Sequence, residues 1–217
     1  MSRNGFAAPF ILLLSLVLVA PASGQIQKGL VAGWNQSDWD YEIPGSSDDF
    51  FQAKNGYCFG VWAGDRFRGN FGWRADLLYT RKGAKSVQRG TDETGADQGD
   101  FDSFFNVDYL EIPALATFTI PTRGKFRPVL YLGPAVAFQV SSKLDVQYPS
   151  GVKYTYSDSD DLEDTSSPDF SLILAGGVDI DAGTTVVNVQ VRYVRGLTEV
   201  YQATKNQTLS IMAGIGI

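Results

Sequence analysis

The feature that most constrains this chain is a set of stretches in which apolar and polar residues alternate. The clearest is VVNVQVRYVRG at residues 186–196. Strand side chains alternate between faces with period two, so this stretch is predicted to be a strand with one apolar and one polar face. A soluble sheet would bury the apolar row, whereas a membrane barrel would turn it to lipid, and the pattern alone leaves both open. The apolar row is Val187, Val189, Val191 and Tyr193, and the polar row is Asn188, Gln190 and Arg192.

Eight such runs are predicted as strands, and no stretch shows a sustained helical period. Three connections between them are short (DRFRG, PTRGKFR and DIDAGT), and they alternate with four long, polar ones. This alternation is typical of transmembrane barrels with short periplasmic turns and long outer loops, and soluble barrels such as lipocalins rarely keep it so strictly. We therefore predict an all-β, eight-stranded antiparallel up-and-down transmembrane barrel. The predicted strands are residues 28–35, 56–65, 70–81, 104–120, 128–144, 169–179, 185–195 and 208–217.

The placement of the aromatic residues favours the membrane. With the valine row outward, Trp73 and Phe118 lie near the short turns, and Tyr79, Phe138 and Tyr193 lie near the long loops. The middles of the outward rows are aliphatic or Ala, which is how aromatic girdles flank a lipid-facing band.

The opposite faces carry charges separated by many Gly and Ala residues. A narrow eight-stranded interior needs small residues, because bulky side chains would not fit. Buried charges persist only when they are paired, so two arginines and two acids indicate a closed, ion-paired lumen rather than an open pore. The predicted lumen polar network is Arg74, Asp76, Glu111, Asn188, Gln190 and Arg192.

The first residues predict export. Arg3 precedes the apolar run FAAPFILLLSLVLVA, and PASG follows with small residues. This is typical of a secretory signal peptide at residues 1–24, cut after Gly24 or, alternatively, after Ala22; an uncleaved anchor is disfavoured because the run is short. Residues 25–217 then form one barrel domain in the cell outer membrane.

Several function classes are disfavoured by composition. The chain has no His, which removes His-based acid–base, nucleophilic and metal chemistry, so we expect no enzyme and no cofactor. Its single cysteine, Cys58, cannot form an intramolecular disulfide. Acidic residues outnumber basic ones, 24 to 18, which argues against a nucleic-acid partner.

One acidic stretch, YSDSDDLED at residues 156–164, has the spacing of a calcium loop in part. Asp158, Asp160 and Glu163 are weak candidate ligands, but the Gly that the sharp turn of such a loop needs is missing. A solvated acidic loop and cation bridging to lipopolysaccharide phosphates are the alternatives. We assign no metal site.

DYLEIPALATF at residues 108–118 and PVLYLGPAVAF at residues 128–138 resemble paired motifs of the PorT-like outer-membrane β-barrel family of Bacteroidota. GLVAGWNQS and GWRADLLYTRKGAK are similar to that family's first and third strands. The resemblance spans the chain after the signal peptide and implies an eight-stranded outer-membrane barrel; the family's namesake takes part in protein secretion. One departure is the last residue, Ile217, where many such barrels end in an aromatic residue.

Two functions follow as hypotheses. The first is a non-catalytic structural or surface-interaction barrel that contacts outer-membrane lipid, lipopolysaccharide and surface or secretion-system proteins. The second is a small-solute channel or a lipocalin-like exported carrier with an apolar ligand.

Overall fold

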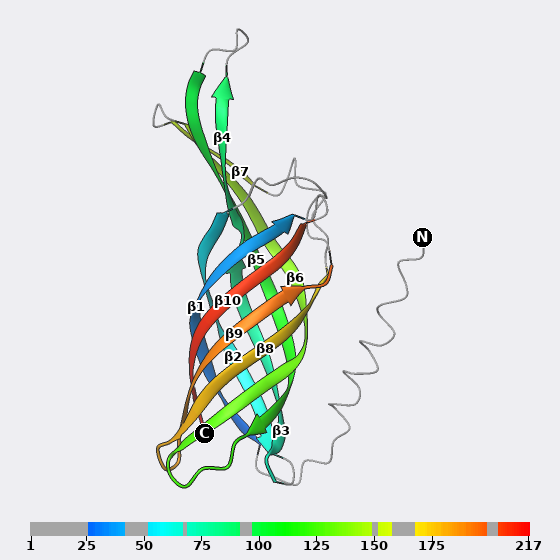
Figure 1. Cartoon of the computed structure of the whole chain (residues 1–217), viewed down its shortest axis with the longest axis vertical. Helices are drawn as coiled ribbons and strands as arrows, with labels where there is room; N and C mark the ends of the chain where they lie inside the picture. Colours follow the sequence, from blue (N-terminus) through cyan, green and yellow to red (C-terminus); the bar gives the residue numbers. More distant parts are fainter. Residues whose placement is uncertain are drawn as a thin grey trace, which may run out of the picture.

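The computed structural model describes residues 26–41, 52–66, 69–91, 97–148, 152–157, 168–198 and 204–217, and these form one antiparallel sheet closed into a barrel (Figure 1). The predicted fold is confirmed, because all eight predicted strands lie in the wall. In addition, β4 continues β3 beyond Gly83, and β7 lies beside the outer end of β6. The strands are β1 Gln27–Tyr41, β2 Gln52–Arg66, β3 Phe71–Lys82, β4 Ala84–Thr91, β5 Asp97–Thr119, β6 Phe126–Gln147, β7 Lys153–Ser157, β8 Asp169–Asp181, β9 Val186–Gly196 and β10 Thr204–Gly216.

The barrel closes where its first and last strands pair. β1 and β10 run antiparallel over thirteen residue pairs, from Gly29 opposite Gly216 to Tyr41 opposite Thr204. Two further backbone bonds, at 3.1 and 3.0 Å, join Lys28 to Ile217. Because the strand number is even, the start of β1 and the end of β10 meet at the end that carries the short turns (Figure 1). Among the described residues, no helix is long and apolar enough to cross a membrane.

The predicted long loops were wrong in part, because strands continue into all four of them. β4, β7 and the outer ends of β5 and β6 extend the wall as a sheet that projects beyond the barrel (Figure 1). We call this the projecting sheet: residues 84–91, 97–106, 143–147 and 153–157. Residues 84–91, 97–103, 145–147 and 153–157 of this sheet were missed because their sequence is mostly polar and lacks the regular alternation that marks the other strands.

The two faces of β9 and β3 are oriented as predicted. On β9, Val189 and Val191 are exposed, at 44% and 49%, whereas Asn188, Gln190 and Arg192 are buried. The same holds on β3, where Leu77 is outward and Arg74 and Asp76 are inward. An apolar exterior around a polar interior is the arrangement of a membrane barrel.

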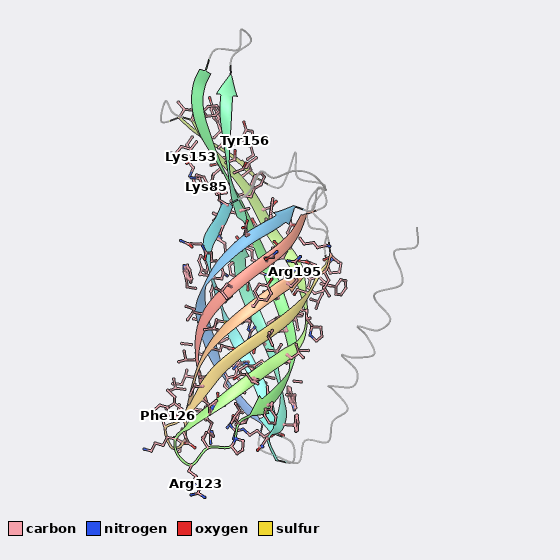
Figure 2. All side chains as sticks on the ribbon, in the orientation of Figure 1. Lys85, Arg123, Phe126, Lys153, Tyr156 and Arg195 are labelled. Atoms are coloured by element: carbon pink, nitrogen blue, oxygen red, sulfur yellow. The ribbon has the colours of Figure 1, made fainter. Side chains whose placement is uncertain are left out.

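The aromatic residues gather at two levels of the outer face. At the turn end Phe71 and Phe118 pack together with ring centroids 5.0 Å apart and ring planes tilted by 52°. At the loop end Phe59 lies 5.3 Å from Tyr79, and Tyr57 lies 6.4 Å from the same ring. Figure 2 shows Phe126 at the turn end as well.

The lumen also holds apolar clusters, which the prediction of a polar interior did not include. Each cluster combines residues from strands far apart in sequence, so the lumen is packed and the polar groups lie between apolar layers. The largest cluster is Leu115, Val129, Tyr131, Ala135, Ile173, Ala175 and Val194, and a second is Val31, Cys58, Trp62, Leu78 and Met212.

Candidate functional site: the lumen polar network

Asp76 is the centre of the network. Its Oδ1 accepts a hydrogen bond from Arg74 Nε, and its Oδ2 accepts one from Arg192 Nη2, both at 2.7 Å. The two arginines come from β3 and β9, which face each other across the lumen. All three side chains are at most 4% exposed, so one carboxylate links opposite sides of the wall through charge-assisted bonds.

Small residues on neighbouring strands make room for these long side chains. Gly64 lies opposite Arg74, Ala175 lies opposite Arg192, and Gly177 lies opposite Gln190. A Cβ at Gly177 would approach the Gln190 Cβ to 2.8 Å, which is too close for a stable contact. The Gly and Ala residues of the polar faces therefore accommodate the network, for the reason that the sequence suggested.

Asn188 extends the network toward the turn end. Its Oδ1 accepts a bond from Arg74 Nη1 at 3.3 Å, and its Nδ2 donates to Tyr131 Oη at 2.9 Å and to Asp179 Oδ1 at 2.7 Å. Asp179 also pairs with Arg66 at 3.3 Å. Gln190 is at the edge of the cluster, where its Oε1 accepts from Arg192 Nη2 at 3.4 Å.

Glu111 does not join this cluster, which corrects the predicted grouping. Its carboxylate pairs with Lys82, 3.4 Å from Nζ to Oε2, with both side chains almost fully buried. The register explains the separation. Glu111 lies opposite Leu78, two residues beyond Asp76 on β3, and is therefore nearer to the outer end of the lumen.

A third polar group lies beyond Lys82 and was not predicted. Asp169 accepts bonds from Thr198 Oγ1 at 2.6 Å and from Asn206 Nδ2 at 2.9 Å. Lys82 Nζ lies 5.5 Å from the Tyr109 ring centroid. Buried polar and charged residues thus continue along the lumen in three successive layers.

Some of the missed residues carried a usable signal. Lys82 has the same parity as Arg74, Asp76, Leu78 and Thr80 on β3, so the inward row could have been extended by one step. Asp179 likewise continues the inward row of β8. The pairing of Lys82 with Glu111 could not have been predicted, because it depends on the register between β3 and β5.

The turn end of the lumen opens into a polar vestibule of about 530 Å³. Its charged lining includes Asp65, Arg66 and the ion pair of Arg127 with Asp181. A narrower space of about 40 Å³ leads inward to Arg74 and Tyr131. The vestibule therefore ends at the layer in which Asp76 joins the two arginines.

The weak calcium candidates Asp158, Asp160 and Glu163 lie outside the described residues. Within the described ranges, no group of three potential metal-ligating side chains gathers.

Comparison with known proteins identifies the family. The family model described as "Outer membrane protein beta-barrel domain" matches residues 21–202, which is most of the chain. No curated protein sequence matches.

Several solved structures are similar to this chain at low sequence identity. Neisserial surface protein A is 15% identical over 88% of this chain and 96% of its own, with a TM-score of 0.48. OprG from Pseudomonas aeruginosa is 12% identical over 89% and 95%, with a TM-score of 0.44. Ail of Yersinia pestis, solved in complex with the heparin analogue sucrose octasulfate, is 15% identical over 89% and 99%, with a TM-score of 0.41.

The family match agrees with the closed eight-stranded wall, the apolar exterior and the polar lumen. The chain therefore belongs to the outer membrane protein beta-barrel domain family, and its place is the cell outer membrane.

Proposed function

We propose that this barrel has a non-catalytic role at the cell surface, in which the wall anchors the chain and the projecting sheet binds a protein partner. The observation that carries this proposal is the free edge of that sheet. Among the described strands β7 pairs only with β6, so it ends the order of the sheet.

The edge is both accessible and rich in aromatic residues. Tyr154 and Tyr156 on β7, and Tyr148 and Val152 just before it, are between 42% and 52% exposed. Figure 2 shows Tyr156 and Lys153 on the projecting sheet, far from the turn end. An exposed edge strand offers unpaired backbone groups to another strand, and tyrosines are enriched at protein interfaces.

The partner class that fits is a surface or secretion-system protein that presents an extended segment. The resemblance to the PorT-like branch supports this assignment. The two motif segments pair in register on β5 and β6, with Ile112 opposite Val136 and Pro113 opposite Ala135. Those strands continue outward into the projecting sheet.

Lipid contacts are expected along the wall. The outer aromatic level faces the leaflet that holds lipopolysaccharide, and Lys143 is exposed on β6, five residues beyond Phe138. A lysine at that height is suited to a lipopolysaccharide phosphate.

Site-specific photo-crosslinking on intact cells tests the surface role. A photoreactive residue at Tyr156 is expected to capture a defined protein, whereas one at Phe126, at the turn end, is not expected to capture the same protein. Substituting Tyr154→Lys should weaken the captured band. If positions 156 and 126 give the same bands, or if Tyr154→Lys leaves the band unchanged, the proposal fails.

A small-solute channel is the second candidate, and the polar vestibule favours it. The pairing of Asp76 with Arg74 and Arg192 supports a lumen that does not conduct ions, because these charges are buried and paired. Purified barrels in planar bilayers are expected to be electrically silent. Discrete conductance steps would favour the channel instead.

The exported-carrier alternative is not retained. The family places the chain in the outer membrane, and charged side chains occupy the lumen where an apolar ligand would need an apolar cavity.

A further inference from the structure

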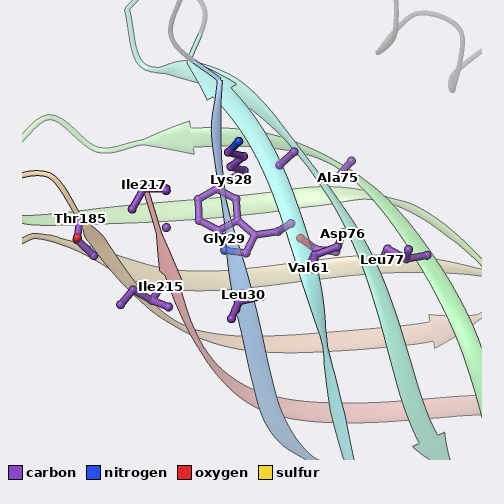
Figure 3. A pocket seen from close by; sticks show the side chains of 13 residues that line it. Lys28, Gly29, Leu30, Val61, Ala75, Asp76, Leu77, Thr185, Ile215 and Ile217 are labelled. Carbon is purple, nitrogen blue, oxygen red and sulfur yellow. The ribbon is translucent and has the colours of Figure 1, made fainter.

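The lipid-facing wall is hollowed at one place, near the turn end, across β10, β1, β2 and β3. The hollow has a volume of about 740 Å³, and almost all of its lining surface is apolar (Figure 3). Strand register explains its shape. A row of branched aliphatic side chains forms one wall: Ile215 lies opposite Leu30, Leu30 opposite Val61, and Val61 opposite Leu77.

The next outward row toward the turn end includes two short side chains, both of them alanines. In it Lys28 lies opposite Ala63, and Ala63 lies opposite Ala75. The two alanines form the bottom of the hollow beside the aliphatic wall. Gly29 and Gly216 in the sheet beneath carry no side chains, and a Cβ on Gly216 would collide with the Trp62 ring. We call this hollow the lipid-facing groove.

One positively charged side chain, that of Lys28, lies at the end of the groove nearest the membrane boundary. Lys28 lines the groove and is exposed, and within the described part of the chain its ammonium has no ion-pair partner. A lysine at the edge of a lipid-facing surface extends its stem along apolar groups and places its charge among the lipid headgroups.

We propose that the lipid-facing groove binds one phospholipid of the periplasmic leaflet, with an acyl chain along Ala63 and Ala75 and the phosphate at Lys28. The groove supplies apolar contact along one chain, and Lys28 supplies the charge that complements the phosphate. The turn end of the barrel faces the periplasm, so the headgroup lies at the depth of Lys28.

Native mass spectrometry tests this proposal. The intact barrel, released from detergent and titrated with phosphatidylglycerol, is expected to retain one lipid saturably. Lys28→Gln should weaken retention about fivefold, the effect of one basic residue near a lipid surface. Ala75→Phe fills the groove without changing charge and should weaken retention at least as much.

Two matched variants control for general effects. Lys125→Gln removes a charge from a turn at the same end of the barrel, outside the groove. Ala213→Phe adds the same ring to an outward position of β10 that does not line the groove. Both are expected to retain the lipid as the parent does, and the shift in gel mobility on heating verifies that each variant is folded.

Three outcomes would overturn the proposal. They are lipid adducts that grow without saturation, equal retention by all four folded variants, and a dimer that Ala75→Phe dissociates. The last outcome would mean that a second copy of the chain covers the groove. None of these outcomes bears on the projecting sheet, which lies at the opposite end of the barrel.

Discussion

Asp76 joins two arginines from opposite sides of the barrel through two buried hydrogen bonds of 2.7 Å. Removing its charge leaves Arg74 and Arg192 facing each other at no more than 4% exposure. An uncompensated buried charge typically costs 3–5 kcal/mol. A single substitution at this residue therefore tests whether the lumen polar network stabilises the fold.

Asp76→Asn is expected to lower the free energy of unfolding by about 3–5 kcal/mol, measured by urea titration of barrels in lipid vesicles. Asp181→Asn is the control, because Asp181 pairs with Arg127 at 3.2 Å at the more open rim. Exposed pairs contribute about 1 kcal/mol or less. Equal losses in the two variants would contradict the central role of Asp76.

Glu111 and Lys82 provide a second test at the residue scale. Because they form a buried pair, Glu111→Gln and Lys82→Met should each destabilise the barrel strongly, and the double variant should lose less than the sum. A coupling energy of at least about 1 kcal/mol is expected for residues in contact.

The control cycle pairs Glu111→Gln with Arg74→Met. Arg74 lies opposite Leu115, four residues along β5 from Glu111, so the two losses should add to within about 0.5 kcal/mol. Coupling of Glu111 to Arg74 rather than to Lys82 would restore the grouping that the sequence alone suggested.

At the scale of elements, the wall strands and the projecting strands differ in what holds them. Each wall strand pairs on both sides, whereas β7, among the strands that the structure describes, pairs only with residues 143–147 of β6. The barrel should therefore tolerate damage to β7 far better than damage to β10.

Proline substitution tests this difference. Thr155→Pro in β7 removes one backbone N–H and the bond from Thr155 Oγ1 to Asp145, and should change the unfolding free energy by less than about 1 kcal/mol. Ala213→Pro in β10 interrupts a strand that is paired on both sides and should cost about 3 kcal/mol or more. Loss of folding in Thr155→Pro would show that the projecting sheet is part of the folding unit.

The elements also show where prediction from sequence ends. The eight wall strands were predicted because one face of each meets lipid and the other meets a packed interior, which imposes the alternation. The side chains described on β7 are exposed, and β4 consists mostly of polar residues, so both segments were interpreted as polar loops. The break at Gly83, with φ of +148°, further hid the continuity of β3 and β4.

For the whole molecule, the sequence predicted which side chains point into the lumen. It did not predict which of those side chains contact one another. Parity assigned Arg74, Asp76, Asn188, Gln190 and Arg192 to the interior, where they lie. Which of them touch depends on the stagger between strands, and no feature of a single strand records it. The signal peptide at residues 1–24 and the role of the network as a barrier to solutes stay predictions.

The valine row of β9 faces lipid, and the polar row of the same strand faces a closed lumen. Spin labels at single cysteines at positions 189, 190 and 191, in a Cys58→Ser background and in lipid vesicles, measure this directly through collision with oxygen, which concentrates in the hydrocarbon. High oxygen accessibility is expected at 189 and 191, and low accessibility at 190. High accessibility at 190 with protection at its neighbours, or no alternation at all, would contradict this orientation of β9.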